Sequence, residues 1–195
     1  LPFTLNVNVN PTVIVAPLST VICSGNSFTL TPVHGENGNI IPIGTTYSWN
    51  VPTYSGSLTG GTSASGQFDI NGRLNNISNT VKTAVYTIFP TTPSCLNIAS
   101  FTVTVIVRPI PVINQMTTII CSGLTFTVTP TNNVSGNIVP AGTLYEWNVP
   151  IVTGSMTGGQ SGANSPNISG TLINPSIIAQ QTANYTVVPR TADCV

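Results

Sequence analysis

The chain has 195 residues, and only four are Lys or Arg and four Asp or Glu, so its formal net charge is zero at pH 7. Charged residues make up 4% of the chain, against roughly 25% in an ordinary soluble domain. This composition gives no basic surface for nucleic acid or for an anionic membrane, and the 41% of hydrophobic residues argues against intrinsic disorder.

Short segments with alternating apolar and polar residues follow one another along the chain. The pattern is clear in residues 3–9, 47–51 and 101–107, where every second residue is apolar or aromatic. Further strands are expected at residues 13–16, 27–31, 68–74 and 84–89, with counterparts in the second half. Gly, Pro and Asn separate these segments, and no helical periodicity of useful length appears. The sequence therefore predicts an all-β protein.

The second half of the chain repeats the first. Cys23–Pro32 aligns with Cys121–Pro130 at seven of ten positions, and Asn39–Pro52 aligns with Asn137–Pro150 at ten of fourteen. The offset is 98 residues and becomes 99 by Tyr86 and Tyr185. A repeat of this size with several short strands predicts two tandem immunoglobulin-like antiparallel β-sandwich domains.

The domain boundaries follow from this alignment. We expect one sandwich over residues 10–108 and a second over 109–195, which lacks a counterpart of residues 100–107. The prolines in Arg108–Pro111 favour an extended, semi-rigid joint. Because residues 3–11 align with 101–109, residues 1–9 are either the closing strand of a preceding repeat or a strand recruited into the first domain. The chain is expected to be a segment of a longer polypeptide.

Each repeat carries two cysteines, one before Ser-Gly and one near its end. Widely spaced cysteines, with a single His in the whole chain, do not resemble a zinc site or a redox-active pair. We expect one disulfide within each repeat, Cys23 with Cys95 and Cys121 with Cys194, which places the protein in an oxidising compartment. Free buried thiols are the alternative.

The two repeats share no charged residue. His34 aligns with Asn132, Asp69 with Asn167 and Arg73 with Thr171, whereas the shared residues are Cys, Gly, Pro, Trp, Tyr and apolar residues. General acid–base catalysis needs positioned titratable groups, and neither a nucleophile elbow nor a phosphate-binding loop is present. We therefore predict no enzyme activity, no catalytic residue and no cofactor, with His34 in a solvated loop.

Calcium is not predicted either. The ion prefers six to eight oxygens with several carboxylates, and four scattered acids leave only a weak site built from backbone carbonyls and one acid, Asp69 or Glu146.

Trp49 and Trp147 are the residues that a glycan-binding hypothesis would use, because aromatic faces stack on sugar rings. Their alternation with Tyr47 and Val51 favours a role in the core instead. The Thr-Gly-Gly segments at 59–61 and 157–159 are expected to supply positive φ angles for turns.

The combined motifs resemble a known family. These motifs are the Cys-Ser-Gly strand start, the Val/Ile-Pro-x-Gly-Thr-x-Tyr-x-Trp segment, the late Tyr-Thr strand and the terminal Cys of each repeat. They are similar to the PKD-like repeats of giant surface proteins in gliding Bacteroidetes. Trp49-Asn-Val-Pro52 departs from the Trp-Asp-Phe-Gly-Asp-Gly run of better-known PKD domains, so the resemblance is to the PKD-like relatives.

The resemblance implies type IX secretion, display on the outer cell surface and a role in gliding and attachment, with no catalytic residue to carry over. The first hypothesis is a structural stalk element of a large adhesin. Its partners are neighbouring repeats and extracellular polysaccharide or substratum, without nucleic acid or membrane insertion. The alternative is a carbohydrate-binding module that recognises surface polysaccharide.

Overall fold

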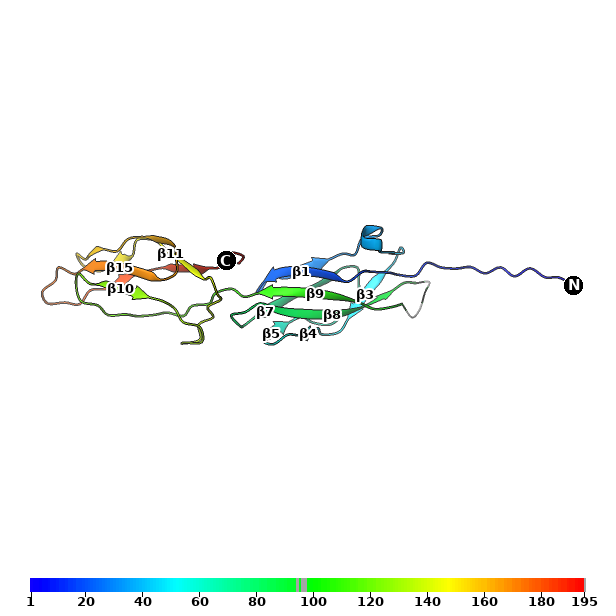
Figure 1. The fold of residues 1–195 in the computed structure, drawn as a ribbon, viewed down its shortest axis with the longest axis horizontal. Coiled ribbons are helices and arrows are strands. Elements are labelled where there is room, and N and C mark those ends of the chain that lie inside the picture. The colour runs from blue at the N-terminus through cyan, green and yellow to red at the C-terminus, as the bar shows by residue number, and fades with distance from the viewer. Residues whose placement is uncertain (94, 96–97, 195) are drawn as a thin grey trace. The chain divides into compact units, whose positions relative to one another are not determined.

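A computed structural model describes residues 1–93, 95 and 98–194. Within them the chain is all-β apart from one three-residue 3-10 helix, η1 (Glu36–Gly38). It divides into two compact units, the first containing Leu1–Asn76 with Val81–Val107 and the second Ile77–Thr80 with Arg108–Val195 (Figure 1). This division falls one residue before the predicted boundary at residues 108 and 109.

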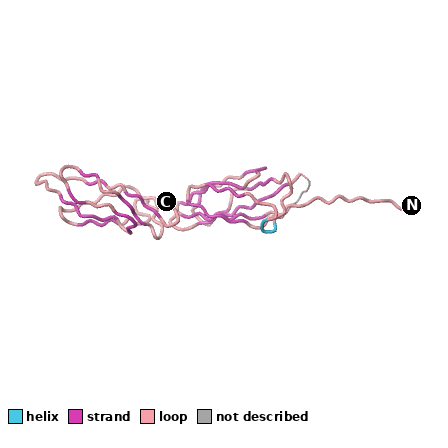
Figure 2. Tube along the Cα trace, turned by 90° about the horizontal axis from the view of Figure 1, so that it is seen from above, coloured by secondary structure: helices cyan, strands magenta, loops and turns pink. Residues whose placement is uncertain are grey.

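Strands alternate with short loops in both units (Figure 2). The strands of the first unit are β1 (Leu18–Cys23), β2 (Ser27–Leu30), β3 (Thr46–Trp49), β4 (Thr53–Tyr54), β5 (Leu58–Gly60), β6 (Ala64–Gln67), β7 (Ile70–Asn76), β8 (Lys82–Thr91) and β9 (Phe101–Arg108). Those of the second unit are β10 (Thr125–Val128), β11 (Leu144–Trp147), β12 (Ile151–Val152), β13 (Thr157–Gly158), β14 (Gly162–Ser165), β15 (Ile168–Ile173), β16 (Ala183–Asn184) and β17 (Val187–Arg190). The predicted all-β, immunoglobulin-like fold class is confirmed.

The first unit is a sandwich of two sheets. One has the order β1-β9-β8-β3-β6, with β4 also paired to β8, and the other has the order β2-β7-β5. Side chains of both sheets meet in one core, where the rings of Phe28 and Tyr86 pack edge to face at 5.5 Å. Strand β9 contributes Phe101, Val103, Val105 and Val107, which alternate with more exposed residues as the period-2 pattern predicts.

The second unit repeats these sheets in part. β10-β15-β13 corresponds to β2-β7-β5, and β14-β11-β17 to β6-β3-β8, while β12 pairs with β16 as β4 pairs with β8. The register is also repeated, since Tyr47 lies opposite Pro90 and Tyr145 opposite Pro189. Among the described residues, no strand corresponds to β1 or β9.

Residues 1–9 lie outside every strand and are exposed, so they are not recruited into the first domain. That they close a preceding repeat stays a prediction. One of the predicted strand segments, residues 13–16, contributes only an isolated bridge from Ile14 to Ile40. The strand of this region is β1, a few residues later, where it pairs with β9. An apolar alternation forms a strand only where an edge is present to pair with it.

No helix among the described residues is long and apolar enough to cross a membrane.

Candidate functional site

The cysteine pairing differs from the prediction. Cys23 and Cys194 are disulfide-bonded, whereas Cys95 and Cys121 are free thiols. Neither predicted bond within a repeat, Cys23 with Cys95 or Cys121 with Cys194, is formed. The prediction of a disulfide-bonded chain is confirmed, but its pairing is wrong.

The geometry of the first unit explains why its two cysteines do not pair. Beside Cys23, the Ser24 hydroxyl accepts a 2.8 Å hydrogen bond from the Asn76 backbone N–H, and the Asn76 side-chain amide donates to the Val107 carbonyl at 3.0 Å. Val107 lies opposite Lys82, at the start of β8. Cys23 therefore lies at the end of the unit where β8 begins.

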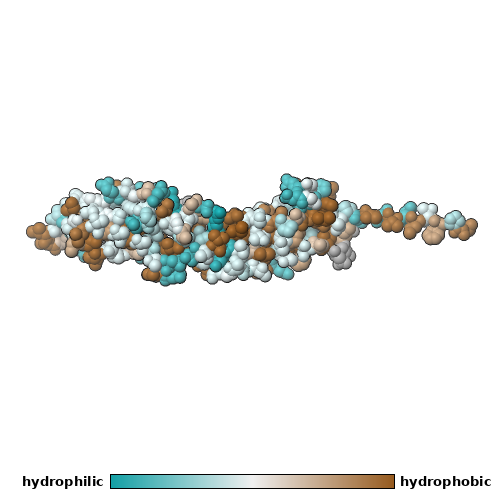
Figure 3. Space-filling view, viewed as in Figure 1, coloured by the Kyte–Doolittle hydropathy of each residue, from teal (hydrophilic) through white to brown (hydrophobic). Residues whose placement is uncertain are grey.

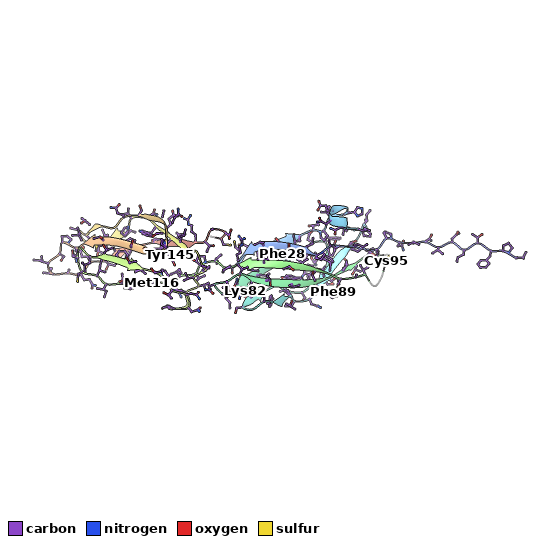
Figure 4. All side chains as sticks on the ribbon, in the orientation of Figure 1. Phe28, Lys82, Phe89, Cys95, Met116 and Tyr145 are labelled. Atoms are coloured by element: carbon purple, nitrogen blue, oxygen red, sulfur yellow. The ribbon has the colours of Figure 1, made fainter. Side chains whose placement is uncertain are left out.

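Cys95 lies at the other end of β8. Its backbone N–H donates to the Thr92 hydroxyl at 3.1 Å, just after the last residue of the strand, and Figure 4 shows it far from Lys82. The strand from Lys82 to Thr91 covers about 30 Å at roughly 3.3 Å per residue. A disulfide requires Cα atoms within about 7 Å, so a bond between Cys23 and Cys95 is excluded.

In the second unit, too, the two cysteines lie at opposite ends. Beside Cys121, the Ser122 hydroxyl accepts a 2.9 Å hydrogen bond from the Asn174 N–H, and the Asn174 amide donates to the Ala179 carbonyl. Cys194 instead follows β17, where its N–H donates to the Thr191 hydroxyl at 3.2 Å. Strands β16 and β17 separate the two positions, so each repeat has one cysteine at each end.

The two tryptophans are in the core. Trp49 is 3% exposed and Trp147 is 6% exposed. Their indole N–H groups donate to the carbonyls of Thr62 and Gln160, each at 3.0 Å. A buried indole offers no free face on which a sugar ring can stack, so this geometry favours the structural role over glycan contact.

His34 performs a structural task in its loop. Its Nδ1 accepts a 3.1 Å hydrogen bond from the Ile41 backbone N–H. In the second repeat the Asn132 side-chain oxygen accepts the corresponding bond from Val139 at 3.0 Å. Because an amide replaces the imidazole without loss of the bond, the position needs an acceptor and not a titratable group.

The acidic residues are also engaged locally. Asp69 accepts a hydrogen bond from Thr31, and Glu146 forms an ion pair with Arg190. Among the described residues, no group of three or more His, Cys, Asp or Glu side chains could hold a metal ion.

The Thr-Gly-Gly segments adopt the predicted positive φ angles. Gly60 and Gly61 have φ of 90° and 69°, and Gly158 and Gly159 have 89° and 72°. A Cβ on Gly61 would lie 2.7 Å from the hydroxyl oxygen of Tyr86. Burial raises the pKa of that phenol to about 12, with a smaller contribution from Tyr54. The prediction is confirmed, and these glycines also make room for a buried tyrosine.

The second unit has an open groove that sequence reasoning did not identify. It has a volume of about 730 Å³, and its lining includes Met116, Tyr145, Tyr185 and Val187 (Figure 4 labels the first two). In the first unit the corresponding place is filled by β9, beside β1 and β8. Tyr86 and Ile88 are fully buried there, whereas their counterparts Tyr185 and Val187 are only partly buried. The sequence did contain a signal for this groove, since the second repeat has no counterpart of residues 100–107 in the given chain.

The comparisons with known proteins agree with this repeated architecture. A family model described as a PKD-like domain matches residues 20–111 and again residues 118–195. No curated protein and no solved structure gives a significant match.

Proposed function

Because this chain belongs to the family of PKD-like domains and carries two of them, we propose that it is a structural repeat segment of a large bacterial cell-surface adhesin. In this proposal the segment is a stalk element of a gliding-motility adhesin of the SprB type in Bacteroidetes. It is exported by type IX secretion and displayed outside the outer membrane. The repeats extend the adhesin and transmit force between the cell and the substratum.

The observation that carries the proposal is that the polar contacts shared by the two repeats are structural hydrogen bonds. The Asn39 side-chain oxygen accepts a 2.9 Å bond from the Ala16 N–H, and Asn137 accepts the same bond from Asn114. The Ser24–Asn76 pair recurs as Ser122–Asn174. The repeated polar contacts close loops and strand ends, while the charged residues and His34 are not repeated. This is what we expect of a repeat with a mechanical role.

Load resistance has a physical basis in the first unit. Strand β9 is held along its length by antiparallel pairing with β8, from Lys82 opposite Val107 to Ile88 opposite Phe101. Its inward side chains are buried in the core of the sandwich. Cys23 is also disulfide-bonded. This covalent bond remains in place when the hydrogen bonds of the sheets break, so it limits how far the chain extends under load.

Surface display and stalk mechanics are tested separately. Antibodies raised against this chain are expected to label intact cells as strongly as permeabilised cells, and labelling only after permeabilisation would contradict surface display. In single-molecule pulling of the chain, we expect discrete unfolding events, and longer extensions after reduction of the disulfide. A smooth extension without events would contradict the stalk role.

The carbohydrate-binding alternative predicts a different result. Surface polysaccharide would change the tryptophan emission or bind the immobilised chain with saturation. We expect neither, because both indoles are buried and hydrogen-bonded.

A further inference from the structure

The first and last strands of the first unit are neighbours in one sheet. Strand β1 (Leu18–Cys23) is the first strand of the unit, and it pairs with β9 (Phe101–Arg108), the last one. The backbone therefore enters the sheet at Leu18 and leaves it at Arg108. A force that is transmitted along the backbone through this unit acts on these two strands from opposite sides of the fold.

Strands β1 and β9 run in the same direction. Just after β1, the Ser24 hydroxyl accepts a 2.8 Å hydrogen bond from the Asn76 backbone N–H, and the Asn76 side-chain amide donates to the Val107 carbonyl at 3.0 Å. Val107 is the last residue but one of β9, so both strands end at the same end of the sandwich. Figure 1 shows the two strands side by side. Neighbouring strands that end together are parallel, whereas β8 and β9 are antiparallel.

This shared direction determines how a pulling force loads the pair. The force draws β1 toward its first residue and β9 toward its last residue, so the two parallel strands slide past each other along their length. All hydrogen bonds between them are then loaded together. In an antiparallel pair, the same force would open the bonds one after another. A single hydrogen bond adds little net stability, so simultaneous loading gives a short pair of strands its resistance.

We propose that β1 and β9 form a mechanical clamp, loaded in shear, which sets the force at which the first unit unfolds. This inference rests on the stalk role proposed above, and it names the element of the stalk that bears the load. The isolated bridge from Ile14 to Ile40 precedes β1. It holds a single residue, so the load reaches β1 once that bridge opens.

Asn76 locks the end of the clamp at which the load leaves the unit. It is the last residue of β7, it is 3% exposed, and its strand belongs to the other sheet of the sandwich. Its backbone carbonyl also accepts a bond from the Ser24 hydroxyl at 3.2 Å, and the next N–H, that of Gly25, donates to the Leu74 carbonyl at 2.8 Å. Sliding of β1 against β9 therefore also has to break bonds to the second sheet.

Burial supports the clamp, and charge contributes little to it. Apart from Arg108, neither strand has a charged residue, and Figure 3 shows little strongly hydrophilic surface over the middle of the pair. The inward side chains of β9 are buried in the core, and Leu18 and Ile22 of β1 pack against it. Backbone hydrogen bonds and burial, and not ion pairs, therefore hold the two strands together.

The decisive test pulls the first unit of the whole chain in two directions. The four native cysteines are replaced by Ser so that no disulfide bears load, and Ile110→Cys gives one attachment point after β9. The second attachment point is either Pro17→Cys, before β1, or Asn26→Cys, after β1, and both positions are exposed. The first choice loads the pair in shear, and the second opens it from the end at Val107. The mean unfolding force is expected to be at least about twofold higher in shear, because the hydrogen bonds break together.

The outcomes separate the clamp from the stalk role. Equal forces in the two directions would overturn the clamp, although discrete unfolding events would still agree with a stalk. Failure of the stalk role would instead appear as a smooth extension of the unsubstituted chain.

A second comparison separates the clamp from general stability, because forced unfolding follows the unfolding rate and not the equilibrium free energy. Asn76→Leu removes the amide bond to Val107 and is expected to lower the shear force about 1.5-fold or more. The control is Leu58→Ala, in the edge strand β5 (Leu58–Gly60) of the other sheet, where Leu58 is buried in the core. It should lower the free energy of unfolding in urea with little effect on the shear force. A shear force that simply follows the urea stability of both variants would overturn the role of Asn76 in the clamp.

Discussion

At single positions in the loops of this protein, the residue type is determined by the space available and by the hydrogen bond that the loop backbone needs. His34 and Asn132 differ in charge and chemistry, yet each accepts one bond from the backbone of its own loop. Gly61 and Gly159 recur because a buried tyrosine hydroxyl lies against each of them. At this scale the repeat preserves contacts, while the charged residues and His34 are not repeated.

Alanine substitutions at Gly61 and Gly66 distinguish the cost of steric crowding from the cost of backbone strain. Their φ angles are 69° and 66°, but a Cβ on Gly61 would lie 2.7 Å from the Tyr86 hydroxyl oxygen, whereas a Cβ on Gly66 meets nothing within 4 Å. Gly66→Ala is expected to lower the free energy of unfolding by about 1 kcal/mol through the strained conformation. Gly61→Ala should cost about 1–3 kcal/mol more through overpacking.

Urea unfolding followed by tryptophan fluorescence measures this difference, in a Trp147→Phe background so that Trp49 alone reports. Equal losses in the two variants would show that the space around Gly61 does not matter.

Tyr86 makes the first unit sensitive to alkaline pH. In the unfolded chain its phenol loses a proton near pH 10, but in the folded unit burial raises its pKa to about 12. The unfolded state therefore binds fewer protons between these pH values, and the free energy of unfolding falls as pH rises through this window. Below pH 10 this group has no effect on the pH dependence.

Tyr86→Phe is expected to reduce the alkaline loss of stability, measured by urea unfolding at pH 7, 10 and 11.5 in the same background. Burial also raises the pKa of Tyr47, so part of the loss should remain. A variant with the same alkaline loss as the parent would contradict the role of Tyr86.

At the scale of elements, one sequence pattern has two outcomes. Residues 101–107 form β9, with Val105 fully buried, while the matching residues 3–9 form no strand and leave Val7 71% exposed. The segment 116–121, which matches β1, is also not a strand. In the first unit β1 pairs with β9, and among the described residues the second unit has no counterpart of β9. Strand formation here depends on an available edge.

Val105 and Val7 test this dependence directly. Val105→Ala is expected to lower the unfolding free energy of the first unit by about 2 kcal/mol, because a fully buried valine side chain is truncated. Val7→Ala should leave it unchanged within about 0.5 kcal/mol. Denaturant unfolding of both variants provides the measurement, and similar losses would mean that residues 1–9 contribute to the first core.

At the scale of the whole molecule, the two units are unequal despite their common sequence. The buried core of the first unit includes all four inward residues of β9, whereas among the described residues the core cluster of the second unit consists of Phe126, Tyr145, Trp147 and Ile168, with Met156 also buried. Less apolar surface is removed from water in the second unit, so its folding is driven less strongly.

We therefore expect unfolding in two steps, with the second unit first. Single-tryptophan variants, Trp49→Phe and Trp147→Phe, assign each transition in a urea titration, and Trp147 should report the lower midpoint. One shared transition for both tryptophans would contradict independent units.

Much of this protein was determined by its sequence alone. Period-2 alternation, turn residues and the 98-residue repeat were sufficient for the fold class, the repeated architecture, the buried tryptophans and the glycine turns, because these depend on local geometry and on which side chains avoid water. The cysteine partners were decided only by the tertiary structure. Which end of a sandwich a residue occupies depends on strand direction over about 30 Å. That direction is not encoded in the spacing of residues along the chain.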